Sequence, residues 1–403
     1  MPTQKLRIAF ATPEYVTESD YDGGLANYLA RVTKALAKLG HDVHVVSLSS
    51  IDETEFEYEG VIVHRVMLKR GWQLLNTLTR YHLPTTLHWL NLSTQVFRKL
   101  KQLNRQKPLH LIQYPNYSFC GVLPILFLRV PHVVRASSYE PAWNEPAGKK
   151  QGLDNRLAHR LEKLQFRLSR RVYAPSSTLQ QMLMSRAGLK DVQLIRSLFY
   201  LENGNWDSSI YDRFLNGRKY LLYFGRFQMR KGFHILAQAL PRFLEQHPEA
   251  YAVLVGRDVT TSLATSMADY AREQCGSFAS RLLVLENLPH RKLFPIIAGA
   301  KLVALPSLID NLPNACLEAM GLGKVVIGTT GTSFDELIND GADGFLVAPN
   351  DASALTEKLI SAWTDPQLVE MGAAAREAME QFTPDKTVEA LLSYYSEVLS
   401  ESK

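Results

Sequence analysis

Residues 305–323 read LPSLIDNLPNACLEAMGLG, and the organisation of the whole chain can be worked out from this stretch. The apolar run at residues 301–305 predicts the end of a buried strand. A turn rich in Pro and Asn follows, and a helix is expected to begin near Asn314. Two carboxylates lie on this strand–loop–helix segment: Asp310 on the loop, and Glu318 about one turn inside the helix.

The segment has groups that suit a nucleotide-sugar. A helix N-terminus exposes unpaired N–H groups and a positive dipole end, so it can receive a diphosphate. The carboxylate of Glu318 could accept two hydrogen bonds from the vicinal hydroxyls of a sugar. An ordinary strand–loop–helix connection explains the same pattern equally well, so the rest of the chain has to decide.

Length and composition describe a globular protein of two domains. The chain has 403 residues, too many for one typical core, and its 46% hydrophobic and 21% charged residues exclude disordered and low-complexity classes. The longest apolar run, residues 122–130, is too short to span a bilayer, and no secretory leader is visible. Three scattered cysteines fit reduced thiols. We therefore expect a cytoplasmic protein.

Charge is distributed very unevenly. Residues 1–200 carry 27 Lys and Arg against 15 Asp and Glu, whereas residues 201–403 carry 18 against 25. Between Glu59 and Glu140 there are eleven basic residues and no acidic one. This pattern favours a surface for anionic membrane lipid or for an anionic acceptor, so peripheral contact with the inner face of a membrane is one expectation. A solvated basic face without a specific partner is the alternative. No nucleic-acid recognition module is present.

Strand-like and helix-like segments alternate from the start of the chain. Residues 6–11, 25–39 and 42–48 predict a strand, a helix and a strand, which form a right-handed βαβ unit of a parallel sheet. The acidic stretch 52–59 predicts a turn. Residues 70–106 predict two amphipathic basic helices, broken near Pro84.

The same alternation restarts in the second half. Residues 201–218 are polar and rich in turn formers, which predicts a linker, and the next strand is expected at residues 220–224. We therefore expect an α/β protein of two doubly wound, Rossmann-like domains, residues 1–205 and 206–382, which face a central cleft. Ligands of such sheets bind at the carboxyl ends of the strands.

Two loops at predicted strand ends have groups suited to phosphate. Gly23 and Gly24 follow the first strand, and glycine lets backbone N–H groups approach a phosphate closely. Arg226 and Lys231 follow the strand at residues 220–224 and could direct two cations at a departing diphosphate. A tight turn and a solvent-facing basic turn are the respective alternatives.

An ordered set of motifs resembles the family-4 retaining glycosyltransferases with the GT-B fold, also described as glycosyl transferases group 1. The resemblance covers nearly the whole chain. It rests on the glycine motif at residues 23–28, the Leu-to-Val pattern at 36–43, the GRxxxxKG pattern at 225–232, the two spaced carboxylates within 306–326, and the trailing DGxxGF pattern at 336–349. Each motif alone is weak evidence for this family, but the set of motifs in this order is specific to it.

The resemblance implies a transfer of sugar from a nucleotide-diphosphate donor to a hydroxyl of a glycan or lipid-linked acceptor, with retention of anomeric configuration. Neither a metal ion nor another cofactor is implied. The catalytic residues would be Asp310, Arg226 and Lys231. The implied donor-binding residues are Gly24, Arg226, Lys231, Leu288, Leu312, Pro313, Asn314 and Glu318. The acceptor would meet Gln113, Tyr114 and Asn116, and a C-terminal helix, residues 383–403, would return to the N-terminal domain.

Three departures from the family pattern raise a second hypothesis. The first carboxylate is Asp310 where the family usually has Glu, Gln113 stands where many members have His, and Gly331-Thr332 replaces a double glycine. These changes fit either an altered sugar preference or a catalytically weak subunit that binds a glycan or a partner enzyme. A nicotinamide dehydrogenase is disfavoured because the third glycine of the dinucleotide fingerprint is absent.

Overall fold

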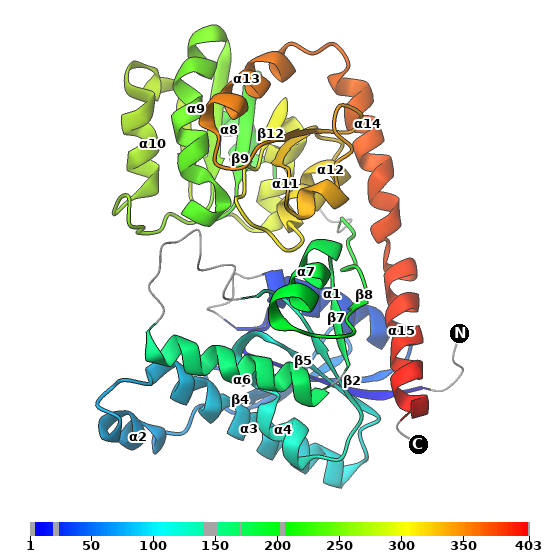
Figure 1. Cartoon of the computed structure of the whole chain (residues 1–403). Coiled ribbons are helices and arrows are strands. Elements are labelled where there is room, and N and C mark those ends of the chain that lie inside the picture. The colour runs from blue at the N-terminus through cyan, green and yellow to red at the C-terminus, as the bar shows by residue number, and fades with distance from the viewer. Residues whose placement is uncertain (1–4, 19–23, 140–151, 170, 202–205, 402–403) are drawn as a thin grey trace. The chain divides into compact units, whose positions relative to one another are not determined.

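The computed structural model describes residues 5–18, 24–139, 152–169, 171–201 and 206–401 (Figure 1). It divides into two compact units, which are treated separately below. Unit 1 comprises Met1–Leu198 together with Phe382–Lys403, and unit 2 comprises Phe199–Gln381. The sequence-based boundaries were placed after residues 205 and 382.

Unit 1 is built on an eight-stranded sheet with the order β3-β4-β2-β1-β5-β6-β7-β8, in which only the β3–β4 pair is antiparallel. The central strand β1 is buried at every residue, as expected for a parallel strand covered on both faces. The strands are β1 (Arg7–Thr12), β2 (Asp42–Leu48), β3 (Glu55–Tyr58), β4 (Val61–Val66), β5 (Leu111–Pro115), β6 (His132–Arg135), β7 (Val172–Ala174) and β8 (Gln193–Leu194).

The helices of unit 1 flank this sheet (Figure 1). The break near Pro84 is confirmed, because Pro84 occupies the first turn of α3, where its missing N–H costs nothing. The last helix of the chain packs against α1. The helices are α1 (Gly24–Lys38), α2 (Trp72–Leu78), α3 (Pro84–Gln106), α4 (Val122–Phe127), α6 (Leu153–Ser169), α7 (Ser177–Met182) and α15 (Pro384–Glu401).

Two local predictions were wrong. The linker predicted at residues 201–218 contains the helix Ser209–Phe214, which belongs to unit 2. The acidic stretch expected to be a turn contains strand β3, which pairs in an antiparallel register with β4. Its side chains are largely exposed, since β3 lies at the edge of the sheet. Charged residues at such an edge discourage pairing with another chain, and this explains the acidic composition that suggested a turn.

Unit 2 is built on a six-stranded sheet, parallel throughout, with the order β11-β10-β9-β12-β13-β14. β10 and β11 follow one another on one side of β9, and β12, β13 and β14 follow one another on the other side. The direction of strand addition therefore reverses between β9 and β12, which makes this pair a topological switch point. The strands are β9 (Lys219–Phe224), β10 (Ala250–Val255), β11 (Leu282–Leu285), β12 (Leu302–Ala304), β13 (Val326–Thr329) and β14 (Phe345–Val347).

Helices cover both faces of this second sheet (Figure 1). α9 packs with α10 and α13, α11 packs with α8, and α12 packs with α14. These helices are α8 (Ser209–Phe214), α9 (Phe233–Gln246), α10 (Met267–Cys275), α11 (His290–Gly299), α12 (Asn314–Gly321), α13 (Ala352–Trp363) and α14 (Leu368–Ala378). The two sheets confirm the predicted α/β class with two Rossmann-like domains.

Candidate functional site

The loops after β9 and β12 meet at the switch point of unit 2. Gly232 has a φ of 65°, and a Cβ at this position would lie 1.7 Å from the carbonyl oxygen of Pro306. The backbone N–H of Leu308 donates to the carbonyl of Arg230 at 2.8 Å. Only glycine permits this close approach, so the GRxxxxKG pattern fastens the two loops together.

This contact brings two predicted catalytic residues together. The ammonium group of Lys231 is ion-paired with the Oδ2 atom of Asp310. Only 7% of the Asp310 side chain is exposed, and its carboxylate also accepts hydrogen bonds from the Ser307 hydroxyl at 3.3 Å and the Asn311 N–H at 3.0 Å. Asp310 is therefore held in a fixed orientation by groups on both loops.

A third loop, after β13, supports the backbone around Asp310. The hydroxyl of Ser333 donates to the Asp310 carbonyl at 2.6 Å, and the hydroxyl of Thr329 donates to the Ser307 carbonyl. The side chain of Thr332 caps the short helix that follows by accepting from the N–H of Phe334 at 3.2 Å. Polar side chains at the end of β13 and in the loop after it thus hold the β12 loop in place.

Glu318 lies in α12 with only 6% of its side chain exposed, and a histidine contacts it. The Nε2 atom of His290, the first residue of α11, is 3.2 Å from the Oε1 atom of Glu318. The His290 ring stacks on Phe294 one turn later, at a centroid distance of 5.3 Å. His290 was not among the residues predicted from the sequence. Its position just after the 287–288 turn was the one available signal.

The other donor-side predictions fall on the same edge of the sheet. Arg226 belongs to the β9 loop, and its carbonyl accepts from the Tyr223 hydroxyl at 2.8 Å. Pro313 is the N-cap residue of α12, and no side chain caps this helix. The helical hydrogen bonds begin after Asn314 and Ala315, whose backbone N–H groups therefore lie at the open end of the helix. Leu312 belongs to the same loop, and Leu288 lies between β11 and α11.

In unit 1, the predicted acceptor-side residues are buried. The Oε1 atom of Gln113 accepts hydrogen bonds from the hydroxyls of Tyr173, at 2.8 Å, and Tyr395, at 2.6 Å. Tyr114 is 1% exposed and packs against Gly121, and the Asn116 amide donates to the Ser138 carbonyl at 2.8 Å and to Glu162. These contacts give all three a packing role, and their role toward an acceptor stays a prediction.

Gly24 is the first described residue of α1, and Gly23 lies outside the described residues. The nearby N–H of Ala26 already has an acceptor, because the Glu14 carboxylate lies 3.3 Å away.

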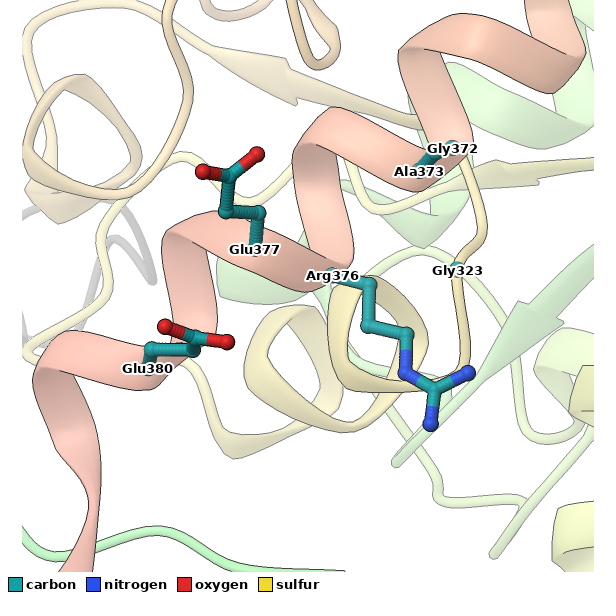
Figure 2. A pocket seen from close by; sticks show the side chains of 6 residues that line it. All are labelled: Gly323, Gly372, Ala373, Arg376, Glu377 and Glu380. Atoms are coloured by element: carbon teal, nitrogen blue, oxygen red, sulfur yellow. The ribbon is translucent and has the colours of Figure 1, made fainter.

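A surface hollow of about 360 Å³ lies beside α14 in unit 2, and Figure 2 shows the residues that line it. None of the predicted site residues lines it. The side chains of Glu377 and Glu380 extend to one side and that of Arg376 to the other. The lining residues are Gly323, Gly372, Ala373, Arg376, Glu377 and Glu380.

Across the residues that the structure describes, no three His, Cys, Asp or Glu side chains gather closely enough to hold a metal ion. In the same residues, no helix combines the length and apolar character required to cross a membrane.

The two parallel-sheet domains define a class, the GT-B fold, and solved structures agree. Sucrose-phosphate synthase of Thermosynechococcus elongatus matches with a TM-score of 0.80 at 19% identity, covering 98% of this chain and 100% of that one. Anabaena HepE in complex with UDP-glucose matches with a TM-score of 0.71 at 19% identity, covering 98% and 100%.

Sequence comparisons supply the family. The profile of glycosyl transferases group 1 matches residues 218–365, and that of glycosyltransferase family 4 matches residues 22–197. An uncharacterized glycosyltransferase of Methanocaldococcus jannaschii is 24% identical over 411 residues, which cover 97% of this chain and 98% of the relative. The chain belongs to the group 1, family 4 glycosyltransferases, which confirms the resemblance that the motifs indicated.

Proposed function

We propose that the protein transfers a sugar from a nucleotide-diphosphate donor to a hydroxyl of a glycan or lipid-linked acceptor, with retention of the anomeric configuration. The observation that carries this proposal is the convergence of Lys231, Asp310 and Glu318 on the loops and helix at the switch point of unit 2. The likeness to HepE, whose structure contains UDP-glucose, supports a nucleotide-sugar as donor.

Each group has a role that its chemistry suggests. Arg226, Lys231 and the free N–H groups at the start of α12 would neutralise the diphosphate as it leaves. Glu318 would hold the ribose hydroxyls, and the backbone near Leu288 would meet the nucleobase. Since this site supplies two cations and a helix N-terminus, we propose that transfer needs no metal ion.

Asp310 would contact the transferred sugar. In the structure its carboxylate is occupied by Lys231, Ser307 and Asn311. Lys231 could turn to the donor phosphate when the donor binds, and this would release one carboxylate oxygen for a sugar hydroxyl. Retention requires attack from the face that the diphosphate leaves, so a cationic Lys231 beside the departing oxygen would stabilise the ion-pair-like transition state.

We further propose that unit 1 contacts an anionic membrane at the inner face. Three large apolar side chains of α2, its following turn and α4 are strongly exposed: Leu78 at 78%, Tyr81 at 68% and Phe127 at 66%. Both helices pack on α3. Exposed cations lie beside these segments in the sequence and on α3, namely Arg70, Arg80, Arg98, Lys101, Arg105 and Arg129. Apolar side chains and cations, in a stretch of sequence without an acidic residue, suit an interfacial surface.

Two measurements test the proposed reaction. Incubation with UDP-, GDP- and ADP-sugars should release the nucleoside diphosphate slowly by hydrolysis, in the presence of EDTA as well as without it. Release should disappear in the Arg226→Ala and Glu318→Ala variants and persist in Glu377→Ala, which lies in the hollow of Figure 2. The anomeric configuration of the first sugar product, read by NMR, then decides retention. An inverted product, or release that persists in Glu318→Ala, would overturn the proposal.

A further inference from the structure

Arg135, the last residue of β6 in unit 1, is a buried cation whose described neighbours are neutral. It is 6% exposed. Its two terminal nitrogens donate to the hydroxyls of Ser137, at 2.8 Å, and Ser197, at 2.9 Å. Its guanidinium carbon lies 3.7 Å from the centroid of the Tyr28 ring. Within the described part of the chain it forms no ion pair with a carboxylate, and its Nε atom has no hydrogen-bond partner.

This environment is incomplete for a guanidinium group. A buried ion costs several kcal/mol unless an opposite charge and a full set of hydrogen bonds compensate for the lost water. The aromatic ring and the two hydroxyls supply part of that compensation, because cation–π contacts strengthen when they are desolvated. The counter-charge and an acceptor for Nε–H are still missing. An oxyanion would provide both.

The position of Arg135 in the fold is a ligand-binding position. In the register of the sheet, Arg135 lies opposite Pro115, the last residue of β5, and Tyr173 on β7. It therefore stands at the carboxyl edge of a parallel sheet, where α/β folds bind their ligands. The Ser197 hydroxyl accepts from Arg135 and keeps its own hydrogen, which it could donate to the same oxyanion.

We propose that Arg135, with Ser197, forms an oxyanion subsite in unit 1 that binds a phosphate or carboxylate group of the acceptor. The assignment to the acceptor rests on the proposed function, in which the donor diphosphate is held by Arg226 and Lys231 of unit 2. The acceptor of this enzyme accordingly carries an anionic group near the hydroxyl that receives the sugar. The planar guanidinium suits this group because it can form two parallel hydrogen bonds to one oxyanion.

The test is a titration of the full-length protein with inorganic phosphate, and separately with acetate, at constant ionic strength. The unfolding temperature is the readout, since an anion at concentration c that is bound only by the folded state stabilises it by RT ln(1 + c/Kd), and this dependence on concentration gives the dissociation constant. An Arg226→Gln background weakens the phosphate response of the proposed donor site. On that background we compare Arg135→Gln, Arg135→Lys and, as a matched control, Arg129→Gln, which alters an exposed arginine of the same unit.

The background protein and the Arg129→Gln control should show the same rise in unfolding temperature with anion concentration. Arg135→Gln should raise the dissociation constant obtained from this rise at least about tenfold, because a charge-assisted pair of hydrogen bonds is lost. Arg135→Lys keeps the charge and loses the two parallel N–H donors, so its dissociation constant should be intermediate. This variant provides the test if Arg135→Gln does not fold.

A response to phosphate alone identifies a phosphate group, and a response to acetate as well identifies a carboxylate. A background protein whose unfolding temperature responds to neither anion, or an Arg135→Gln dissociation constant within twofold of the background value, would overturn the subsite.

A second arm separates acceptor from donor. In the otherwise unaltered chain, Arg135→Gln should leave the affinity for UDP, GDP or ADP within twofold. A tenfold loss of nucleotide affinity would show that Arg135 binds the donor diphosphate, and it would overturn the acceptor assignment. If Glu318→Ala leaves nucleotide affinity unchanged, the proposed donor site fails, and the phosphate titration at Arg135 still stands or falls by itself.

Discussion

The ammonium group of Lys231 is ion-paired with the carboxylate of Asp310, although 79 residues separate the two in sequence. The pairing of β9 with β12 places their loops side by side, and the Gly232–Pro306 contact fixes the distance between them. The two loops thus hold this cation and carboxylate together. Asp310 is almost fully buried whereas Lys231 is 27% exposed, so the carboxylate depends more on this pair.

Lys231→Met should therefore destabilise the protein by about 1–3 kcal/mol, the cost of leaving a buried polar group without its partner. Adding Asp310→Asn to the Lys231→Met variant should restore part of the lost stability, because the neutral amide needs no cation to compensate for a buried charge. Urea unfolding of the two single variants and the double variant measures the coupling. Single effects that add to within about 0.5 kcal/mol would show that the pair is not energetically linked.

Glu318 should control nucleotide binding. Glu318→Gln keeps the shape of the side chain and removes its charge, so the dissociation constant of the preferred nucleoside diphosphate should rise about 10- to 100-fold, since hydrogen bonds to charged groups contribute ~1.5–3 kcal/mol. Calorimetric titration measures this. The matched control is Glu377→Gln on α14, an exposed glutamate, which should bind like the unaltered protein. A change below twofold in Glu318→Gln would remove Glu318 from the donor site.

His290 should orient Glu318. With its Nε2 atom 3.2 Å from Oε1, the imidazole restrains one oxygen of the carboxylate that we propose as the ribose ligand. His290→Ala should weaken nucleotide binding about 2- to 5-fold, which corresponds to one hydrogen bond of ~0.5–1 kcal/mol. His290→Gln, which can still donate, should restore most of the affinity. Equal loss in both variants would point to the lost stacking on Phe294 instead.

The local parts of the fold could be read from sequence, and the contacts between distant segments could not. The loops at residues 225–232 and 305–313 were found because glycine, proline and charge recur there in a short pattern. The ion pair between them depends on strand order, which periodicity does not report. His290 was missed for the same reason, since its partner Glu318 belongs to another helix and no motif includes the histidine.

Gln113 illustrates the limit most clearly. The family resemblance predicted an amide that meets the acceptor, and the structure surrounds Gln113, the third residue of β5, with two tyrosine hydroxyls. One comes from β7, and the other, Tyr395, lies 282 residues away in α15. No local pattern indicates that the C-terminal helix supplies this hydroxyl. The strand β3 was missed for a different reason: alternating acidic residues at an exposed sheet edge have the composition of a turn.

Stability should fall as the pH decreases from about 6.5 toward 4, in part through His64. This imidazole is fully buried between His44 and Glu55, with ring hydrogen bonds of 2.9 Å to each, and burial lowers its pKa to about 4, with Glu55 opposing and His44 and Lys99 adding to the shift. The unfolded chain binds the proton more tightly, so the contribution is complete above the unfolded value and is lost as the pH approaches the folded one. The shift corresponds to ~3 kcal/mol.

Urea unfolding between pH 7 and pH 4 measures this loss. Carboxylates titrate in the same range, so the quantity of interest is the difference between the unaltered protein and His64→Gln, which retains a polar group and cannot take up the proton. The pH dependence should be shallower in that variant. His82→Gln, which replaces an exposed histidine, should follow the unaltered protein. Parallel curves for all three proteins would show that His64 contributes nothing to acid destabilisation.

Leu78 and Phe127 should anchor unit 1 to anionic bilayers. Both side chains are more than half exposed on helices that pack against α3, and exposed arginines lie beside them in the sequence. The unaltered protein should float with vesicles containing anionic phospholipid and not with neutral vesicles, because attraction to the cations and burial of the apolar side chains act together. The double variant Leu78→Glu and Phe127→Glu should reduce the bound fraction at least about tenfold, since each burial contributes ~1.5–3 kcal/mol.

Val369→Glu is the control: Val369 is 80% exposed on α14 of the acidic half of the chain, and its replacement should leave flotation unchanged. Equal flotation with neutral and anionic vesicles, or an unaffected double variant, would show that this surface does not bind membranes.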